Sequence, residues 1–236
     1  MQFLFRYANP AQFMRLSDVV LPFLAGATLL AFGVGLYMGL AVPPDYQQGD
    51  TVRIMFLHVP AAVAATSVYG AITVCSILSL VWRHPLSDTA ARAAAPFGAL
   101  FTALGLVTGA IWGKPMWGTY WVWDARLTSF LLLLFIYFGY MALWNAIEDE
   151  VKAARAAAIL ALVGAVNIPI IKFSVEWWNT LHQGESIVSG HLAPVFLAPL
   201  LVMMLAYLLL CATLWTVRIR TAILERRARS LMQGAA

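Results

Sequence analysis

The feature that most constrains this chain is a series of six apolar stretches, each long enough to form a membrane-spanning helix. A helix needs roughly 20 apolar residues to cross the ~30 Å hydrocarbon core of a bilayer. The stretches are residues 19–42, 54–82, 93–113, 127–147, 153–171 and 192–217. Because the chain is 62% hydrophobic and 11% charged, one water-soluble core could not bury them all. The sequence therefore predicts an all-α, polytopic membrane protein, with about six transmembrane helices in one domain covering residues 1–236.

The lysine and arginine distribution predicts the orientation of these helices. Six spans place both termini on the same side of the membrane, and eleven of the 15 basic residues fall on that side. The other four are Arg53, Lys114, Arg126 and Lys172. Because basic residues concentrate in cytoplasmic loops, we expect both termini to be cytoplasmic. The net charge of +4 is then a topology signal and no indication of nucleic-acid binding.

Motifs that the full sequence lacks limit the functions open to this chain. It contains no G-x-x-x-x-G-K-[ST] loop, so any nucleotide-driven step would need another subunit. It contains no C-x-x-C-H sequence, so it cannot carry thioether-attached haem. Cys75 and Cys211 lie far apart inside apolar stretches, which indicates no disulfide framework.

Two features inside the predicted helices have packing explanations. Asn167 and Pro169 interrupt the fifth stretch, and a transporter subunit would have a polar site at such a depth. A proline-kinked packing helix explains the same pair more simply. The spacing of Gly105 and Gly109, repeated at residues 35 and 39, is typical of helices that approach closely.

The predicted non-cytoplasmic loop 112–126 contains four of the nine tryptophans. An aromatic belt at the membrane surface would explain some of them, but not four within about a dozen residues. If the segment after Pro115 is helical, Trp117, Trp121 and Asp124 fall near one face. That arrangement would form a flat aromatic shelf with a polar edge, suited to a large planar hydrophobic ligand.

Two histidines are predicted at the level of this shelf. His58 lies at the outer end of the second stretch, and His182 lies in the loop before the sixth. A single interfacial histidine is more often a polar anchor than a ligand. Two beside an aromatic platform suit the two axial positions of a planar iron macrocycle, which makes haem the natural ligand. The four outward basic residues could then meet the haem propionates, or serve only as interfacial anchors.

The segment WGTYWVWDARLT, residues 117–128, closely resembles the tryptophan-rich WWD signature of the haem-handling protein family. More narrowly, it resembles the haem exporter protein C family, the C component of the system I cytochrome c maturation apparatus. Segments 45–49, 58–62, 112–116 and 174–184 extend the resemblance over nearly the whole chain. Tyr120 departs from the pattern, because tryptophan is expected there.

This resemblance implies a site and its ligand. His58 and His182 match the two axial metal ligands, and haem b would be held non-covalently and transiently between them. The further haem-binding residues that it implies match or border the loop signature: Trp117, Tyr120, Trp121, Trp123, Asp124 and Arg126. No catalytic residue is implied, so we expect a haem-delivery subunit and no enzyme.

The resemblance also implies a cellular role. The chain would lie in the bacterial inner membrane and deliver haem from its periplasmic face to a periplasmic haem chaperone during c-type cytochrome biogenesis. It would belong to an ABC-type haem export or release complex with an ATP-binding subunit, a second membrane subunit and a small single-span subunit. The alternative is a membrane b-type cytochrome that transfers electrons, although such proteins usually hold haem between helices inside the span.

Overall fold

Among the residues that the computed structural model describes, six segments of one or two helices are long and apolar enough to span a membrane. This confirms the all-α prediction. The structure describes residues 9–84, 86–178, 180, 182 and 192–234. The first four spans are single helices, of which the second follows a short 3₁₀ helix. The elements are α2 (Pro10–Ala41), η1 (Asp50–Ile54), α3 (Met55–Trp82), α4 (Ser87–Trp117), α5 (Ala125–Ala146), α6 (Glu150–Ala165), α7 (Asn167–Trp177) and α8 (Pro194–Gly234).

Polar residues outside the apolar stretches determine where several helices begin. The Asn9 side chain accepts a hydrogen bond from the Ala11 N–H, and Pro10 occupies the first turn of α2. Asp149 accepts from the first N–H groups of α6 in the same way. Because the Asn9 cap lies in polar sequence, α2 begins before the uncharged stretch that predicted it. α4 and α8 also extend well beyond their predicted stretches.

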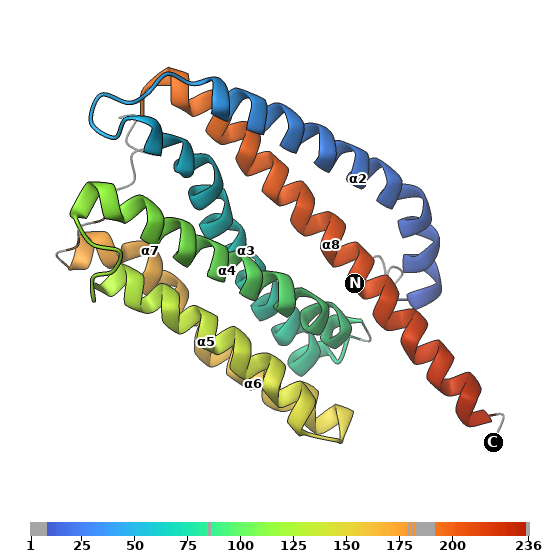
Figure 1. The fold of residues 1–236 in the computed structure, drawn as a ribbon. Helices are drawn as coiled ribbons and strands as arrows, with labels where there is room; N and C mark the ends of the chain where they lie inside the picture. The colour runs from blue at the N-terminus through green and yellow to red at the C-terminus, as the bar shows by residue number, and fades with distance from the viewer. Residues whose placement is uncertain (1–8, 85, 179, 181, 183–191, 235–236) are drawn as a thin grey trace.

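The helices form three layers (Figure 1). α3 and α4 pack side by side in the middle layer, α2 and α8 cover one side, and α5 with α6 and α7 covers the other. Buried tyrosines connect the layers: the Tyr69 hydroxyl donates to the Ala161 carbonyl at 3.0 Å, and the Tyr137 hydroxyl donates to the Ala65 carbonyl at 2.8 Å. Each buried hydroxyl thus has a backbone acceptor in place of water, and buried polar groups require such a hydrogen-bond partner.

The fifth span consists of two helices with a break at Val166. Pro169 lacks an N–H and its ring conflicts with the preceding turn, so the helix cannot run through unbroken. Asn167 is buried at the break and donates from its Nδ2 to the Ser129 carbonyl at 2.9 Å. This hydrogen bond joins α7 to α5, which supports the packing explanation over a transport site at this depth.

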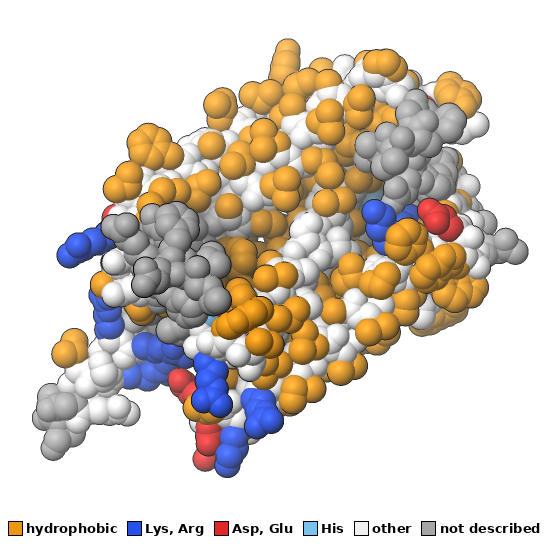
Figure 2. Space-filling view, turned by 180° about the vertical axis from the view of Figure 1, so that it is seen from behind, with side chains coloured by type: hydrophobic (Ala, Val, Ile, Leu, Met, Phe, Trp, Pro, Cys, Tyr) orange, Lys and Arg blue, Asp and Glu red, His pale blue; other side chains and the backbone are white. Residues whose placement is uncertain are grey.

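The two ends of the helical bundle differ in composition. We call the end that holds segments 42–54 and 118–124 the loop end, and the end where α2 begins and α8 finishes the termini end. Figure 2 shows lysines and arginines gathered at the termini end, with an apolar band over the middle of the bundle. This separation is the one expected for a protein that crosses a bilayer.

Candidate functional site

The aromatic loop at the loop end is not helical. α4 ends at Trp117 because Gly118 adopts a left-handed conformation with φ of 74°, which breaks the helix, and the chain has no helix again until Ala125. The prediction that Trp117, Trp121 and Asp124 share one helical face is therefore wrong. Trp117 belongs to α4, whereas Trp121 belongs to the loop.

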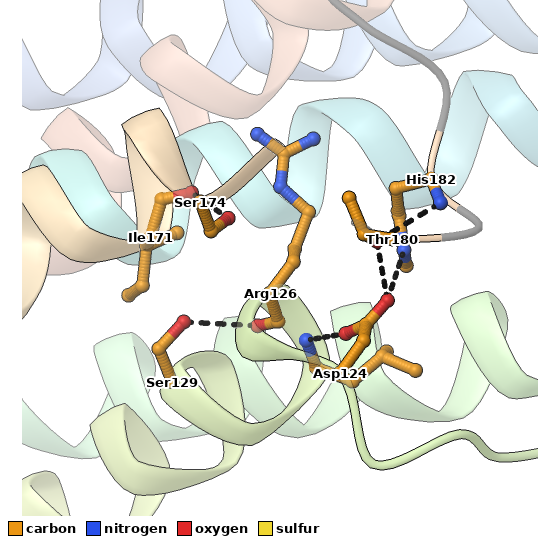
Figure 3. Close-up of polar contacts among 8 residues, drawn as sticks. Asp124, Arg126, Ser129, Ile171, Ser174, Thr180 and His182 are labelled. Atoms are coloured by element: carbon orange, nitrogen blue, oxygen red, sulfur yellow. Dashed lines mark hydrogen bonds and ion pairs between the residues drawn. The ribbon is translucent and has the colours of Figure 1, made fainter. Parts of the chain in front are cut away.

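Asp124 connects this loop to the segment that follows α7 (Figure 3). Its Oδ1 accepts a hydrogen bond from the Leu127 N–H at 2.7 Å and so caps the start of α5. Its Oδ2 accepts a hydrogen bond from the Thr180 hydroxyl and lies 3.6 Å from Nδ1 of His182. The Thr180 Oγ1 in turn accepts the His182 backbone N–H at 3.1 Å. One carboxylate therefore positions both a helix and a histidine.

His182 lies in a largely buried aromatic setting. Its ring centroid is 4.8 Å from that of Trp117, and its side chain is 16% exposed. Burial lowers the pKa of His182, an effect that the Asp124 carboxylate opposes only in part. The folded protein thus favours the neutral imidazole near pH 7, and this is the form that binds iron.

His58 lies one turn inside α3 and faces α4. Its Nδ1 is 3.0 Å from the Gly105 carbonyl and 3.2 Å from the Thr108 hydroxyl. It packs edge-on against Trp112, with ring centroids 5.7 Å apart. Gly109 leaves the space for this ring, since a Cβ there would lie 2.8 Å from Cε1 of His58. Gly109 thus makes room for the His58 ring, whereas its spacing from Gly105 predicted only close packing of helices.

The two histidines suit axial ligation of a haem. When Nδ1 of His58 donates to the Gly105 carbonyl, Nε2 carries the lone pair that an iron ligand needs. Asp124 can favour the same tautomer of His182, whose buried Nδ1 completes no hydrogen bond within the described chain. His58 lies close enough to His182 to interact with it electrostatically, and Arg126 acts on both histidines.

The other predicted residues lie in distinct positions around this pair. Trp121 and Trp123 pack edge-to-face with ring centroids 5.4 Å apart, and Trp123 is 76% exposed. Tyr120 is also exposed, beneath the Lys114 ammonium at 5.2 Å. The Arg126 side chain extends away from Asp124, and its Nη2 is 3.5 Å from the Lys172 carbonyl.

Among the four outward basic side chains, Arg53 and Lys114 form hydrogen bonds with nearby backbone carbonyls. Arg53 pairs with Asp50 at 3.2 Å and donates to the Val42 carbonyl. Lys114 donates to the Gly118 carbonyl at 2.8 Å, next to the helix end that Gly118 forms. These contacts favour the anchoring role for both residues over a propionate contact.

The family of the chain follows from its similarity to known proteins. Residues 3–233 match the family model described as Heme exporter protein C. The chain belongs to the Heme exporter protein C family. The Heme exporter protein C of Bradyrhizobium diazoefficiens is 57% identical over 227 residues, which cover 95% of this chain and 86% of that protein. Its Escherichia coli K12 counterpart is 48% identical over 96% of this chain and 93% of that one.

Membership of the Heme exporter protein C family confirms the resemblance found in segment 117–128. Together with six apolar helices, it makes this chain a multi-pass inner-membrane protein. The residues that sequence reasoning missed are those that support the histidines. Thr180 and Thr108 carry no sequence pattern of their own. Trp112 donates to the Gln48 side chain at 2.9 Å, a contact that its place among the loop tryptophans does not predict.

Proposed function

We propose that the chain holds haem b non-covalently and transiently at its loop end and delivers it to a periplasmic haem chaperone. The observation that carries this proposal is the convergence of His58 and His182, from α3 and from the segment after α7, beside Trp112 and Trp117. Its relatives are named as haem exporters, which supports haem as the cargo. The role is haem export for c-type cytochrome biogenesis.

The geometry supports delivery over electron transfer. His58 lies one turn from the start of α3, and His182 lies outside the helices, so both ligands are at one end of the bundle. A b-type cytochrome shields its haem between helices to tune a redox potential. Exposed Trp123 and Tyr120 sit at the same end, where a partner can approach. The site is therefore built for access from outside the membrane.

The chain acts within this proposal as the haem-holding subunit of an ABC-type complex. A nucleotide-driven step belongs to an ATP-binding partner, because the sequence has no phosphate-binding loop of its own. A second membrane subunit and a small single-span subunit complete the assembly. The chain itself performs no catalytic step.

The loop end faces the periplasm in this proposal, and cysteine labelling in cells tests that orientation. We expect Tyr46→Cys, at a position that is 90% exposed at the loop end, to react in intact spheroplasts with a membrane-impermeant maleimide. Ser230→Cys, near the end of α8, should react only after lysis. The parent would carry Cys75→Ser and Cys211→Ser, so that each variant has one thiol. The reverse pattern would place the haem site on the cytoplasmic side.

Haem transfer tests the delivery step. We expect purified, haem-loaded protein to pass haem to the apo-chaperone faster than to a passive haem scavenger, as followed by absorbance after the proteins are separated. Trp123→Ala should slow transfer to the chaperone, measured per bound haem, because this exposed side chain offers its face to a partner. Equal rates to both acceptors would mean that haem simply dissociates, and delivery would be the wrong description.

A further inference from the structure

A cavity lies at the termini end, far from the histidine pair. It measures about 220 Å³ and opens between the start of α4, the end of α5 and the middle of α8. Its walls are formed by Arg92, Pro96, Tyr140, Met141, Trp144, Asn145 and Arg218. The proposed haem function uses none of these residues.

Two arginines line this cavity, and its walls contain no acidic residue. Asp88 lies one turn before Arg92 on α4, outside these walls, and interacts electrostatically with Tyr140. The Arg92 guanidinium lies 4.8 Å above the ring of Trp144, and Arg218 enters from α8. Neither forms an ion pair with an acidic residue in the part of the chain that the structure describes. Arg220, only two residues along α8, does pair with Asp18 at 2.6 Å. The cavity therefore concentrates positive charge, and the ligand that it favours is an anion.

A buried hydrogen-bond donor in the same wall is also unsatisfied. The Trp144 side chain is 7% exposed, and its Nε1–H has no acceptor among the described residues. The Tyr140 hydroxyl interacts with this indole, but the contact falls short of hydrogen-bond geometry. A buried donor of this kind usually finds a partner, and an anion oxygen in the cavity would provide one. Asn145 adds a side-chain amide to the wall.

The membrane side of the cavity is apolar. Leu100 lies eight residues beyond Arg92 on the same face of α4, roughly 12 Å deeper into the bilayer, and it is 62% exposed. Phe138 lies about one turn deeper than Met141 on α5 and is also exposed. An anion bound by the arginines can thus continue into hydrocarbon chains that lie against these two residues.

We propose that this cavity binds the phosphate of an anionic phospholipid from the membrane leaflet at the termini end. Two guanidinium groups and an indole N–H supply donors for phosphate oxygens, and arginine forks fit that geometry well. The volume falls below the roughly 300–1,000 Å³ typical of sites for drug-sized molecules, so it suits a headgroup better than a macrocycle. Basic pockets between helices near a membrane surface recognise lipid headgroups by the same physics.

Native mass spectrometry of the purified full chain tests this proposal. We expect phosphatidylglycerol to bind more tightly than phosphatidylcholine in detergent. Arg92→Gln and Arg218→Gln should each weaken phosphatidylglycerol binding about tenfold or more, because each removes charge-assisted hydrogen bonds. Arg227→Gln is the matched control, since it removes the same charge from an exposed position further along α8. Melting temperatures establish that all three variants fold.

The other outcomes would overturn the proposal. Equal loss in Arg227→Gln would mean that binding follows net charge alone. Equal binding of the two lipids would remove the anionic selectivity. Displacement of phosphatidylglycerol by millimolar inorganic phosphate would identify a site for the free anion instead of the lipid. Haem absorbance should be unchanged in Arg92→Gln and Arg218→Gln, so a negative lipid result leaves the haem proposal untouched.

Discussion

His58→Gly and His182→Gly should each remove most of the haem that co-purifies with the wild-type chain. Each substitution deletes one axial ligand and leaves a hole of imidazole size beside Trp112 or Trp117. Loss of an outer-shell partner alone typically weakens a metal site 10–100-fold, so loss of the ligand itself should cost at least about 100-fold in haem affinity. Added imidazole should refill the hole and restore haem. Oxidised and reduced optical spectra of the purified variants measure both effects.

His84→Gly is the control for these two variants. His84 follows the end of α3 at the termini end, the opposite end of the bundle from the proposed haem site. Its replacement should leave the haem spectrum and the bound amount unchanged. Equal haem loss in all three variants would show that glycine at any histidine destabilises the protein, and the ligand assignment would fail. Haem loss that imidazole does not reverse would indicate a structural role instead of coordination.

Gly109→Ala should weaken haem binding about 10–100-fold, although it changes neither a ligand nor an aromatic residue. The new Cβ would lie 2.8 Å from Cε1 and 3.2 Å from Nδ1 of His58. The ring must move, and that movement breaks the hydrogen bond from Nδ1 to the Gly105 carbonyl, which is 3.0 Å long. Nε2 then points away from the position that an iron ligand must occupy. Haem titration followed by absorbance measures the change in affinity.

Gly70→Ala is the matched control for Gly109→Ala. Gly70 lies in the middle of α3, and a Cβ there would meet no atom within 4 Å. Alanine favours a helix over glycine by up to about 1 kcal/mol, so backbone propensity acts in the same direction at both positions. Only the contact with His58 differs. If both variants bind haem as the wild type does, the His58 ring does not need this position to hold iron.

The number of helices and the family could both be predicted from the sequence. Hydropathy depends on the sum over about 20 neighbouring residues, so residues 127–147 could be recognised as a span without knowledge of any contact. The segment 117–128 carried the family resemblance because its tryptophans, glycine and aspartate are adjacent in the chain. The distribution of basic residues predicted an orientation that only labelling will test.

The loop shows where local reasoning failed. A helix through Trp117, Trp121 and Asp124 was a reasonable expectation from spacing alone. Gly118 ends α4 instead, since it can adopt a φ of 74° at no steric cost, and its carbonyl then accepts a hydrogen bond from Lys114. Each loop residue therefore has its own position, because no helical spacing relates it to its neighbours. Asp124 becomes a helix cap and a histidine partner, where a shelf edge had been predicted.

The sequence by itself determined the six spans and the family, and it predicted His58 and His182 as candidate ligands. The tertiary structure alone decided that His58 packs against Gly105 and Gly109, and that Asp124 reaches His182 through a segment 58 residues further along the chain. An apolar stretch becomes a span because lipid buries its side chains and its own helix pairs its backbone groups, so no contact with another helix is needed. Ligand orientation depends on close contacts between helices distant in sequence, and these contacts exist only once the bundle has packed.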